Sequence, residues 1–293
     1  MTGIKFNRSD SNWPDILLLF ILAIPFLLIA YAYFTAKFGL ERRYEADITF
    51  INIPKDDEAI AEGRRLSRIR GCFWCHGENL EGDQYFAEAD RGIIVVAPNL
   101  TKKIREYSPE DFSRAVRHGI RPDGTSLQPA MPSFAYYNIS DDDMGLILAY
   151  IQNLPEQEGM LGEFRLMPLG WIRWTLNSFP NNVASMIDHN VERLSPAVNG
   201  PSHLRGKYLA ESICTECHGD NGRKRVFGTP DLNIALGYSR EEFFHLMRSG
   251  EPRHDEPIDY HMIEVSKYRY IDMKDTEIDA LYSYLQSLRE GMN

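Results

Sequence analysis

The longest apolar stretch of the chain lies close to its N-terminus. The 21 residues from Ile16 to Ala36 carry no charged side chain. As a helix rising about 1.5 Å per residue, this stretch would be roughly 31 Å long, which matches the hydrocarbon core of a bilayer. The pattern therefore predicts a transmembrane anchor at residues 16–36, preceded by a short N-terminal segment at residues 1–15.

A cleaved signal peptide is the alternative interpretation of this stretch. Lys5 and Arg8 precede it, and Ala30, Tyr31 and Ala32 resemble a small-x-small cleavage site. The apolar core of a signal peptide is usually about 7–15 residues long, so the greater length here favours an anchor that is retained. Basic residues lie on both sides of the stretch, and flanking charge therefore does not set its orientation.

The hydrophobic pattern beyond the anchor occurs twice, roughly 140 residues apart. Each copy begins with a helical periodicity that contains a Gly-x-x-Leu step and leads into a pair of cysteines. A Pro-Asn-Leu or Pro-Asp-Leu tripeptide, a second helix, a methionine and a closing apolar helix follow. The predicted helices span residues 59–70, 109–118 and 144–154 in the first copy, and 204–212, 240–249 and 278–288 in the second. So long a period indicates a duplicated domain rather than a solenoid of short repeats.

The two copies predict domains at residues 57–156 and 203–293, joined by a linker at residues 157–202. The linker contains Trp171, Trp174 and Phe179 among Gly, Pro and Asn residues, which favour turns. One interpretation is that these aromatic side chains pack between the domains. The other is a short helix lying on the membrane surface, where tryptophan is favoured.

Composition and charge exclude some classes of function. The chain is 25% charged and 43% hydrophobic, as globular proteins are. Its formal net charge of -10 argues against nucleic-acid binding, which requires a basic face. An acidic surface would instead suit a basic protein partner.

The four cysteines form two pairs of identical spacing. Cys72 and Cys75 precede His76, and Cys214 and Cys217 precede His218. This Cys-x-x-Cys-His pattern is typical of haem attachment. Two thiols on one turn of backbone form thioethers to neighbouring vinyl groups of a porphyrin, and the histidine that follows reaches the iron as its proximal ligand. The sequence thus predicts two covalently bound haem c groups, with His76 and His218 as metal ligands.

A zinc site and a redox-active dithiol also use paired cysteines. Neither requires the histidine that follows both pairs here. A zinc ribbon would also bring its pairs within about 20 residues of each other. The haem interpretation is therefore favoured over both.

Methionine is the sixth iron ligand that raises the reduction potential. Met131 is the candidate in the first domain, because Pro129 and Pro132 restrict its loop and would hold the sulfur with little loss of entropy. In the second domain Met262 lies at nearly the same distance from its Pro-Asp-Leu tripeptide as Met131 does from its own. His261 and Met273 remain alternatives, because no proline follows Met262.

The sequence resembles the class I cytochrome c domain twice, over about residues 57–156 and 203–289. More narrowly, it is similar to cytochromes that serve periplasmic dehydrogenases and respiratory oxidases. The motifs are Ala97-Pro98-Asn99-Leu100-Thr101, Arg117-His118-Gly119 and Met131-Pro132 in the first copy, and Gly206-Lys207-Tyr208-Leu209 and Met262-Ile263-Glu264-Val265 in the second.

The resemblance implies a mostly α fold, with an N-terminal transmembrane helix followed by two helical domains. In each domain the helix of Gly63 or Gly206 would cross the helix of Tyr150 or Tyr284. The resemblance also implies that the carbonyl groups of Pro98 and Pro230 orient His76 and His218. Haem attachment in this family places both domains on the periplasmic face of the cytoplasmic membrane, which would leave residues 1–15 in the cytoplasm.

The expected function is electron transfer rather than catalysis. The protein would relay single electrons between a respiratory donor and acceptor, as a carrier or as a subunit of a larger complex. Family members serve dehydrogenases, quinol-oxidising complexes and terminal oxidases. The alternatives are a dihaem oxidoreductase or peroxidase with an open iron position at the second haem, and an assembly subunit whose haems are passive.

Overall fold

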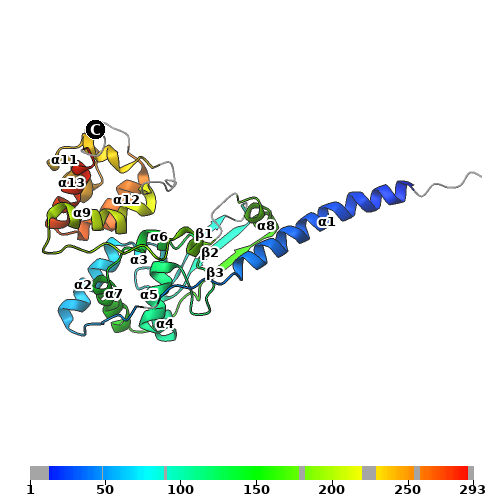
Figure 1. Ribbon diagram of the computed structural model, residues 1–293, viewed down its shortest axis with the longest axis horizontal. Helices are drawn as coiled ribbons and strands as arrows, with labels where there is room; N and C mark the ends of the chain where they lie inside the picture. Colours follow the sequence, from blue (N-terminus) through cyan, green and yellow to red (C-terminus); the bar gives the residue numbers. More distant parts are fainter. Residues whose placement is uncertain are drawn as a thin grey trace, which may run out of the picture.

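The computed structural model describes residues 13–47, 49–88, 91–177, 182–219, 229–253 and 258–289. A long helix, α1 (Trp13–Leu40), projects from two mostly helical domains that lie against each other (Figure 1). The predicted fold class is confirmed. The predicted segment 1–15 falls mainly outside the described residues.

Helix α1 extends beyond the predicted span at both ends. Its stretch Asp15–Leu40 has a mean hydropathy of 2.6 over an 18-residue window, of which only 6% is buried. Length and composition therefore permit a membrane span. They also fit a signal sequence near the N-terminus.

The first domain is organised around two crossing helices, α2 (Asp57–Ile69) and α7 (Asp141–Asn153). The side chains of Asp56 and Ser140 cap their N-termini by accepting backbone N–H bonds. The helices touch at Gly63, where a Cβ atom would lie 1.9 Å from the carbonyl oxygen of Leu146. The crossing therefore requires glycine.

The second domain repeats this crossing with α9 (Ser202–Leu209) and α13 (Asp275–Ser287). A Cβ atom on Gly206 would lie 1.9 Å from the carbonyl oxygen of Ala280. The predicted Gly-x-x-Leu step thus marks the contact between crossing helices in both domains.

The remaining helices are short. Helices α5 and α11 have the bounds predicted from the sequence. The set comprises α3 (Cys72–His76), α4 (Leu100–Glu106), α5 (Pro109–His118), α6 (Ser133–Tyr136), α8 (Pro168–Thr175), α10 (Thr215–His218), α11 (Arg240–Ser249) and α12 (Tyr260–Tyr268). Three short 3-10 helices, η2 (Val183–Met186), η4 (Leu232–Gly237) and η5 (Tyr270–Asp272), and one short π-helix, η3 (Ala210–Cys214), accompany them.

A three-stranded antiparallel sheet in the first domain was not predicted. Strand β2 (Ile93–Ala97) lies between β1 (Asp83–Glu88) and β3 (Glu163–Leu166), with Ile93 opposite Leu166. Strand β3 belongs to the segment expected to be a linker. Part of that segment is therefore built into the first domain.

Helix α8 packs on the C-terminal end of α1 rather than between the domains (Figure 1). Trp174 is buried in a small cluster with Ala36 and with Ile93 and Leu166 of the sheet. The ring of Trp171 meets that of Tyr33 edge-on at 4.9 Å. The expectation that these tryptophans pack between the domains is wrong, because α1 supplies their apolar partner. Phe179 lies outside the described residues.

The two domains share a core. Their buried apolar side chains form one continuous cluster, and α6 of the first domain contacts η3 and α10 of the second. Buried polar contacts cross the same interface. Arg70 donates to Asp143 at 2.6 Å, and the hydroxyl of Tyr208, from the second domain, donates to the same carboxylate at 2.6 Å.

Candidate functional site

The first cysteine motif forms one short helix bounded by glycines. Helix α3 begins after Gly71, which has φ +76°, and ends before Gly77, which has φ +86°. Only glycine adopts such angles readily. Because Cys72 and Cys75 are three positions apart on this helix, their thiols share one face.

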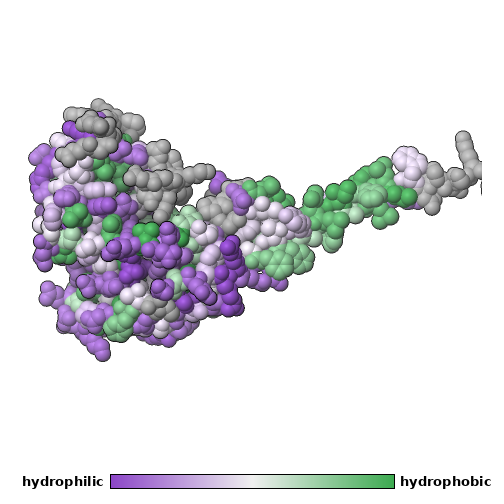
Figure 2. Space-filling view, viewed as in Figure 1, coloured by the Kyte–Doolittle hydropathy of each residue, from purple (hydrophilic) through white to green (hydrophobic). Residues whose placement is uncertain are grey.

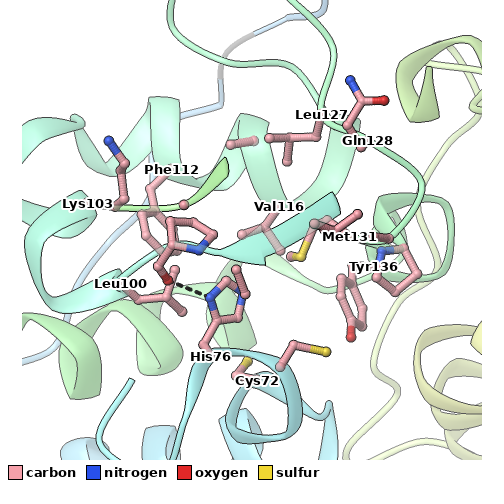
Figure 3. Close-up of a pocket in the computed structure, with 18 of the residues that line it drawn as sticks. Cys72, His76, Leu100, Lys103, Phe112, Val116, Leu127, Gln128, Met131 and Tyr136 are labelled. Carbon is pink, nitrogen blue, oxygen red and sulfur yellow. Dashed lines mark hydrogen bonds between the residues drawn. The ribbon is translucent and has the colours of Figure 1, made fainter. Parts of the chain in front are cut away.

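His76 directly follows the second cysteine and is buried. Its Nδ1 atom lies 2.7 Å from the carbonyl oxygen of Pro98 (Figure 3). Since a carbonyl only accepts, Nδ1 must carry the proton, and Nε2 is left as the basic ring nitrogen. Burial lowers the pKa of His76. The imidazole is thus held neutral, as a metal ligand must be.

A cavity of about 390 Å³ opens beside this motif. Cys72, Cys75 and His76 line it together with Met131, which comes from the loop before α6 (Figure 3). The structure therefore brings all four predicted residues of the first site to one cavity. Apolar side chains from helices α4, α5 and α7 complete much of the lining, among them Leu100, Phe112, Val116, Ile147 and Ile151.

Two parts of this lining were missed by the sequence analysis. Strand β2 contributes Val95 and Val96, and the start of β3 contributes Phe164. The apolar β-branched run at 93–97 was the available signal for a strand. Lys103 and Arg121 also line the cavity, so that it would accommodate an anionic group.

Burial disfavours the thiolate form of three of the four cysteines. It raises the pKa of Cys72 to about 11, that of Cys214 to about 12 and that of Cys217 to about 11. A redox-active dithiol has a lowered pKa instead. Nor do three or more metal-binding side chains converge anywhere in the described residues. The zinc and dithiol interpretations therefore find no support in the geometry.

The second motif repeats the first histidine contact. Cys214 ends η3, and Cys217 and His218 lie on α10. The Nδ1 atom of His218 is 2.8 Å from the carbonyl oxygen of Pro230, and burial lowers the pKa of this histidine as well. Both histidines are thus oriented by a proline carbonyl.

The three candidates for the sixth ligand in the second domain differ in their surroundings. His261 is exposed, and its Nδ1 lies 2.8 Å from Asp259. Met273 is buried and directly precedes the N-cap of α13. The core residue Ile139 has the corresponding position before α7 in the first domain. Met262 lies in the first turn of α12, partly buried against the core. Residues 220–228 and 254–257 lie outside the described part of this region.

Models of known protein families match both domains. Residues 58–151 match the model described as cytochrome c oxidase, cbb3-type, subunit III, and residues 204–289 match the cytochrome c model. Both domains are cytochrome c domains. The resemblance seen in the sequence is confirmed, and the group implied by these domains is haem c.

Relatives of the whole chain include cytochrome subunits of dehydrogenases. The chain is 28% identical to the gluconate 2-dehydrogenase cytochrome c subunit of Pantoea cypripedii, over 80% of this chain and 60% of the relative. It is 27% identical to the fructose dehydrogenase cytochrome subunit of Gluconobacter japonicus, over 78% of this chain and 52% of the relative. A diheme cytochrome c-type protein of Cereibacter sphaeroides is 24% identical over 54% of this chain and 56% of the relative. The chain thus spans little more than half the length of these relatives.

The residues around the first cavity fit a haem c group. They combine a pair of thiols, a neutral imidazole and a thioether with an apolar lining, which is the donor set of a c-type site. When bound, such a group supplies reversible one-electron transfer at its iron.

Proposed function

We propose that this protein transfers single electrons through two covalently bound haem c groups. Thiols of the paired cysteines would attach the haems, and His76 with Met131 and His218 with Met262 would be the axial ligands. The observation that carries the proposal is the repeated contact between a motif histidine and a proline carbonyl, at 2.7 Å and 2.8 Å. Two motifs about 140 residues apart in the sequence share it, as expected for two equivalent sites.

The residues around the motif histidines orient these ligands and shape the cavity in this proposal. The carbonyl group of Pro98 holds the proton on Nδ1 of His76, so that Nε2 is available to a metal; Pro230 does the same for His218. The apolar lining excludes water from the cavity. The cationic side chains of Lys103 and Arg121 line the cavity and would balance the negative charge of the haem carboxylates.

The partner that the relatives favour is a dehydrogenase. Gluconate and fructose dehydrogenases are the proteins whose cytochrome subunits this chain resembles. We infer that the chain is the electron-accepting subunit of a membrane-bound dehydrogenase and does not itself transform a substrate. Its net charge of -10 would suit a basic docking face on the partner.

We also infer that α1 is kept as an anchor, with both haem domains on the periplasmic side. Ala32 and Ala36 are buried, and the hydroxyl of Thr175 on α8 reaches the Ala32 carbonyl at 3.5 Å. The candidate cleavage site thus lies inside a helix on which α8 packs. The apolar surface of α1 continues onto this part of the molecule (Figure 2), and α8 exposes Leu169 and Ile172. Helix α8 would therefore lie at the membrane surface.

Counting attached haems tests the electron-transfer proposal. The chain is expressed in a host that attaches haem c, and its intact mass is measured after denaturation. We expect the mass of two haems in the parent chain. We expect the mass of one haem in the Cys72→Ser/Cys75→Ser variant, and again of one in Cys214→Ser/Cys217→Ser, because each pair serves only its own domain. A parent chain without covalent haem contradicts the proposal.

The same intact protein tests whether the anchor is retained. Membranes are washed with alkaline carbonate, and the N-terminus of the protein that stays in the pellet is determined. We expect residues 16–36 to be present and the protein to resist the wash, because a helix of this length inserts stably. An N-terminus at residue 33 in a protein released by the wash would show a cleaved signal peptide.

A further inference from the structure

A buried arginine of the second domain lies against the first cysteine motif. Arg269 follows α12 and is 5% exposed. Its guanidinium covers Gly71, the residue before Cys72, so closely that a Cβ atom there would lie 2.5 Å from the Arg269 Cζ atom. The close approach is possible because position 71 is glycine. The first site thus has a cation from the other domain at its cysteine end.

The partner of this arginine belongs to the second motif. Glu216 lies between Cys214 and Cys217, and its carboxylate accepts a bond from Arg269 Nη2 at 2.9 Å. This attraction raises the pKa of Arg269, which stays charged. One ion pair between a buried arginine and a partly buried glutamate therefore joins the two haem-attachment segments. Its positive end lies against the first motif and its negative end lies within the second.

The environment makes this pair electrostatically effective. The Nε atom of Arg269 is buried with no hydrogen-bond partner, and the neighbouring side chains of Tyr136 and Tyr270 are buried as well. Charges that are removed from water are poorly screened, so they act over a longer range than surface charges. An ion pair removed from water is often no more stabilising than apolar side chains of similar volume, which favours a role beyond holding the domains together.

We propose that the Arg269–Glu216 pair sets the difference in electron affinity between the two sites. This inference rests on the proposed function and deepens it. A nearby cation stabilises a site that has gained an electron, and a nearby anion destabilises it. Arg269 lies close to both motifs, so its charge raises the electron affinity of both sites. Glu216 lies within the second motif and offsets this effect there, which leaves the first site with the higher electron affinity. Electrons are thereby biased from the second domain towards the first.

Another ion pair at the same interface provides a matched control. Arg65 of the first domain donates to Glu277 of the second at 2.8 Å. It links the domains as Arg269 does, but it does not adjoin either cysteine motif. A purely structural role would make the two pairs equivalent.

The test is spectroelectrochemical titration of the full haem-loaded chain in detergent. Arg269→Met is expected to lower the reduction potential of the first site, and Glu216→Gln to raise that of the second. The double variant, which carries both Arg269→Met and Glu216→Gln, is expected to have a smaller difference between the reduction potentials of the two sites. Arg269→Lys, which keeps the charge, should restore most of the separation, and Arg65→Met should leave it unchanged. Thermal unfolding of each variant reports structural damage separately.

The two single variants are expected to shift reduction potentials in opposite directions, and this distinguishes an electrostatic role of the ion pair from a structural one. Loosening of the interface would expose both sites to water in either variant and shift both potentials in one direction. Potentials that shift in the same direction in Arg269→Met and in Glu216→Gln overturn the inference, as do unchanged potentials in variants that carry both haems; the electron-transfer function stands in either case. A parent chain without attached haem would instead overturn the proposed function.

Discussion

Replacing Met131 with alanine is expected to remove the methionine–iron absorption of the first haem and to lower its reduction potential. The sulfur of Met131 lines the same cavity as His76, and thioether ligation favours the reduced iron. Absorption spectra and redox titration of the haem-loaded chain measure both effects. Met131→His should keep a six-coordinate iron but also give a low potential, because a second imidazole favours the oxidised form.

The matched control for this prediction is Met144→Ala. Met144 is fully buried in the core of the first domain but does not line the cavity. Its loss should cost about 2–5 kcal/mol of stability, as for other large-to-small core substitutions, and leave the iron spectrum unchanged. If Met131→Ala behaves like Met144→Ala, Met131 is a core residue and not a ligand.

The corresponding pair in the second domain is Met262→Ala and Met273→Ala. We expect the spectrum of the second haem to change only in the first of these, because Met273 occupies the core position that Ile139 has in the first domain. A spectrum that is unchanged in Met262→Ala would leave the second iron with another ligand or an open position. An oxidoreductase or peroxidase activity at that iron would then become credible.

Substituting Gly63 with valine is expected to prevent stable folding of the first domain. A Cβ atom at this position would lie 1.9 Å from a backbone carbonyl of α7, and a backbone atom cannot rotate aside as a side chain can. The helices must move apart along their whole contact. We expect a cost of more than about 3 kcal/mol, above the usual range for overpacking. Thermal unfolding and the yield of haem-loaded protein measure it.

Ala61→Val is the control for this substitution. Ala61 lies on the exposed side of the same helix, so valine there changes helix propensity by only about 0.6 kcal/mol. Gly206→Val should repeat the effect of Gly63→Val in the second domain, where the corresponding distance is also 1.9 Å. Equal stabilities of Gly63→Val and Ala61→Val would contradict the close crossing.

Features that depend on local spacing could be predicted from the amino-acid sequence alone. Cysteines three positions apart and followed by histidine occupy one helical turn in both domains. Helix periodicity also placed α5 and α11 at their observed bounds. These features follow from chain geometry and from apolar periodicity, which act over a few residues.

Features that join distant segments could not be predicted from the sequence, because they depend on the packing of the whole chain. Strand β3 pairs with β2 across about 70 residues of chain, and α8 finds its apolar partner on α1. Arg269 reaches Gly71 from the other domain. The local sequence of these segments does not identify the distant segments that they contact, because many neighbours would stabilise a short strand, an apolar helix face or a single arginine equally well. The choice is made when the whole chain packs, and that packing brings the two cysteine motifs together at the ion pair of Arg269 and Glu216.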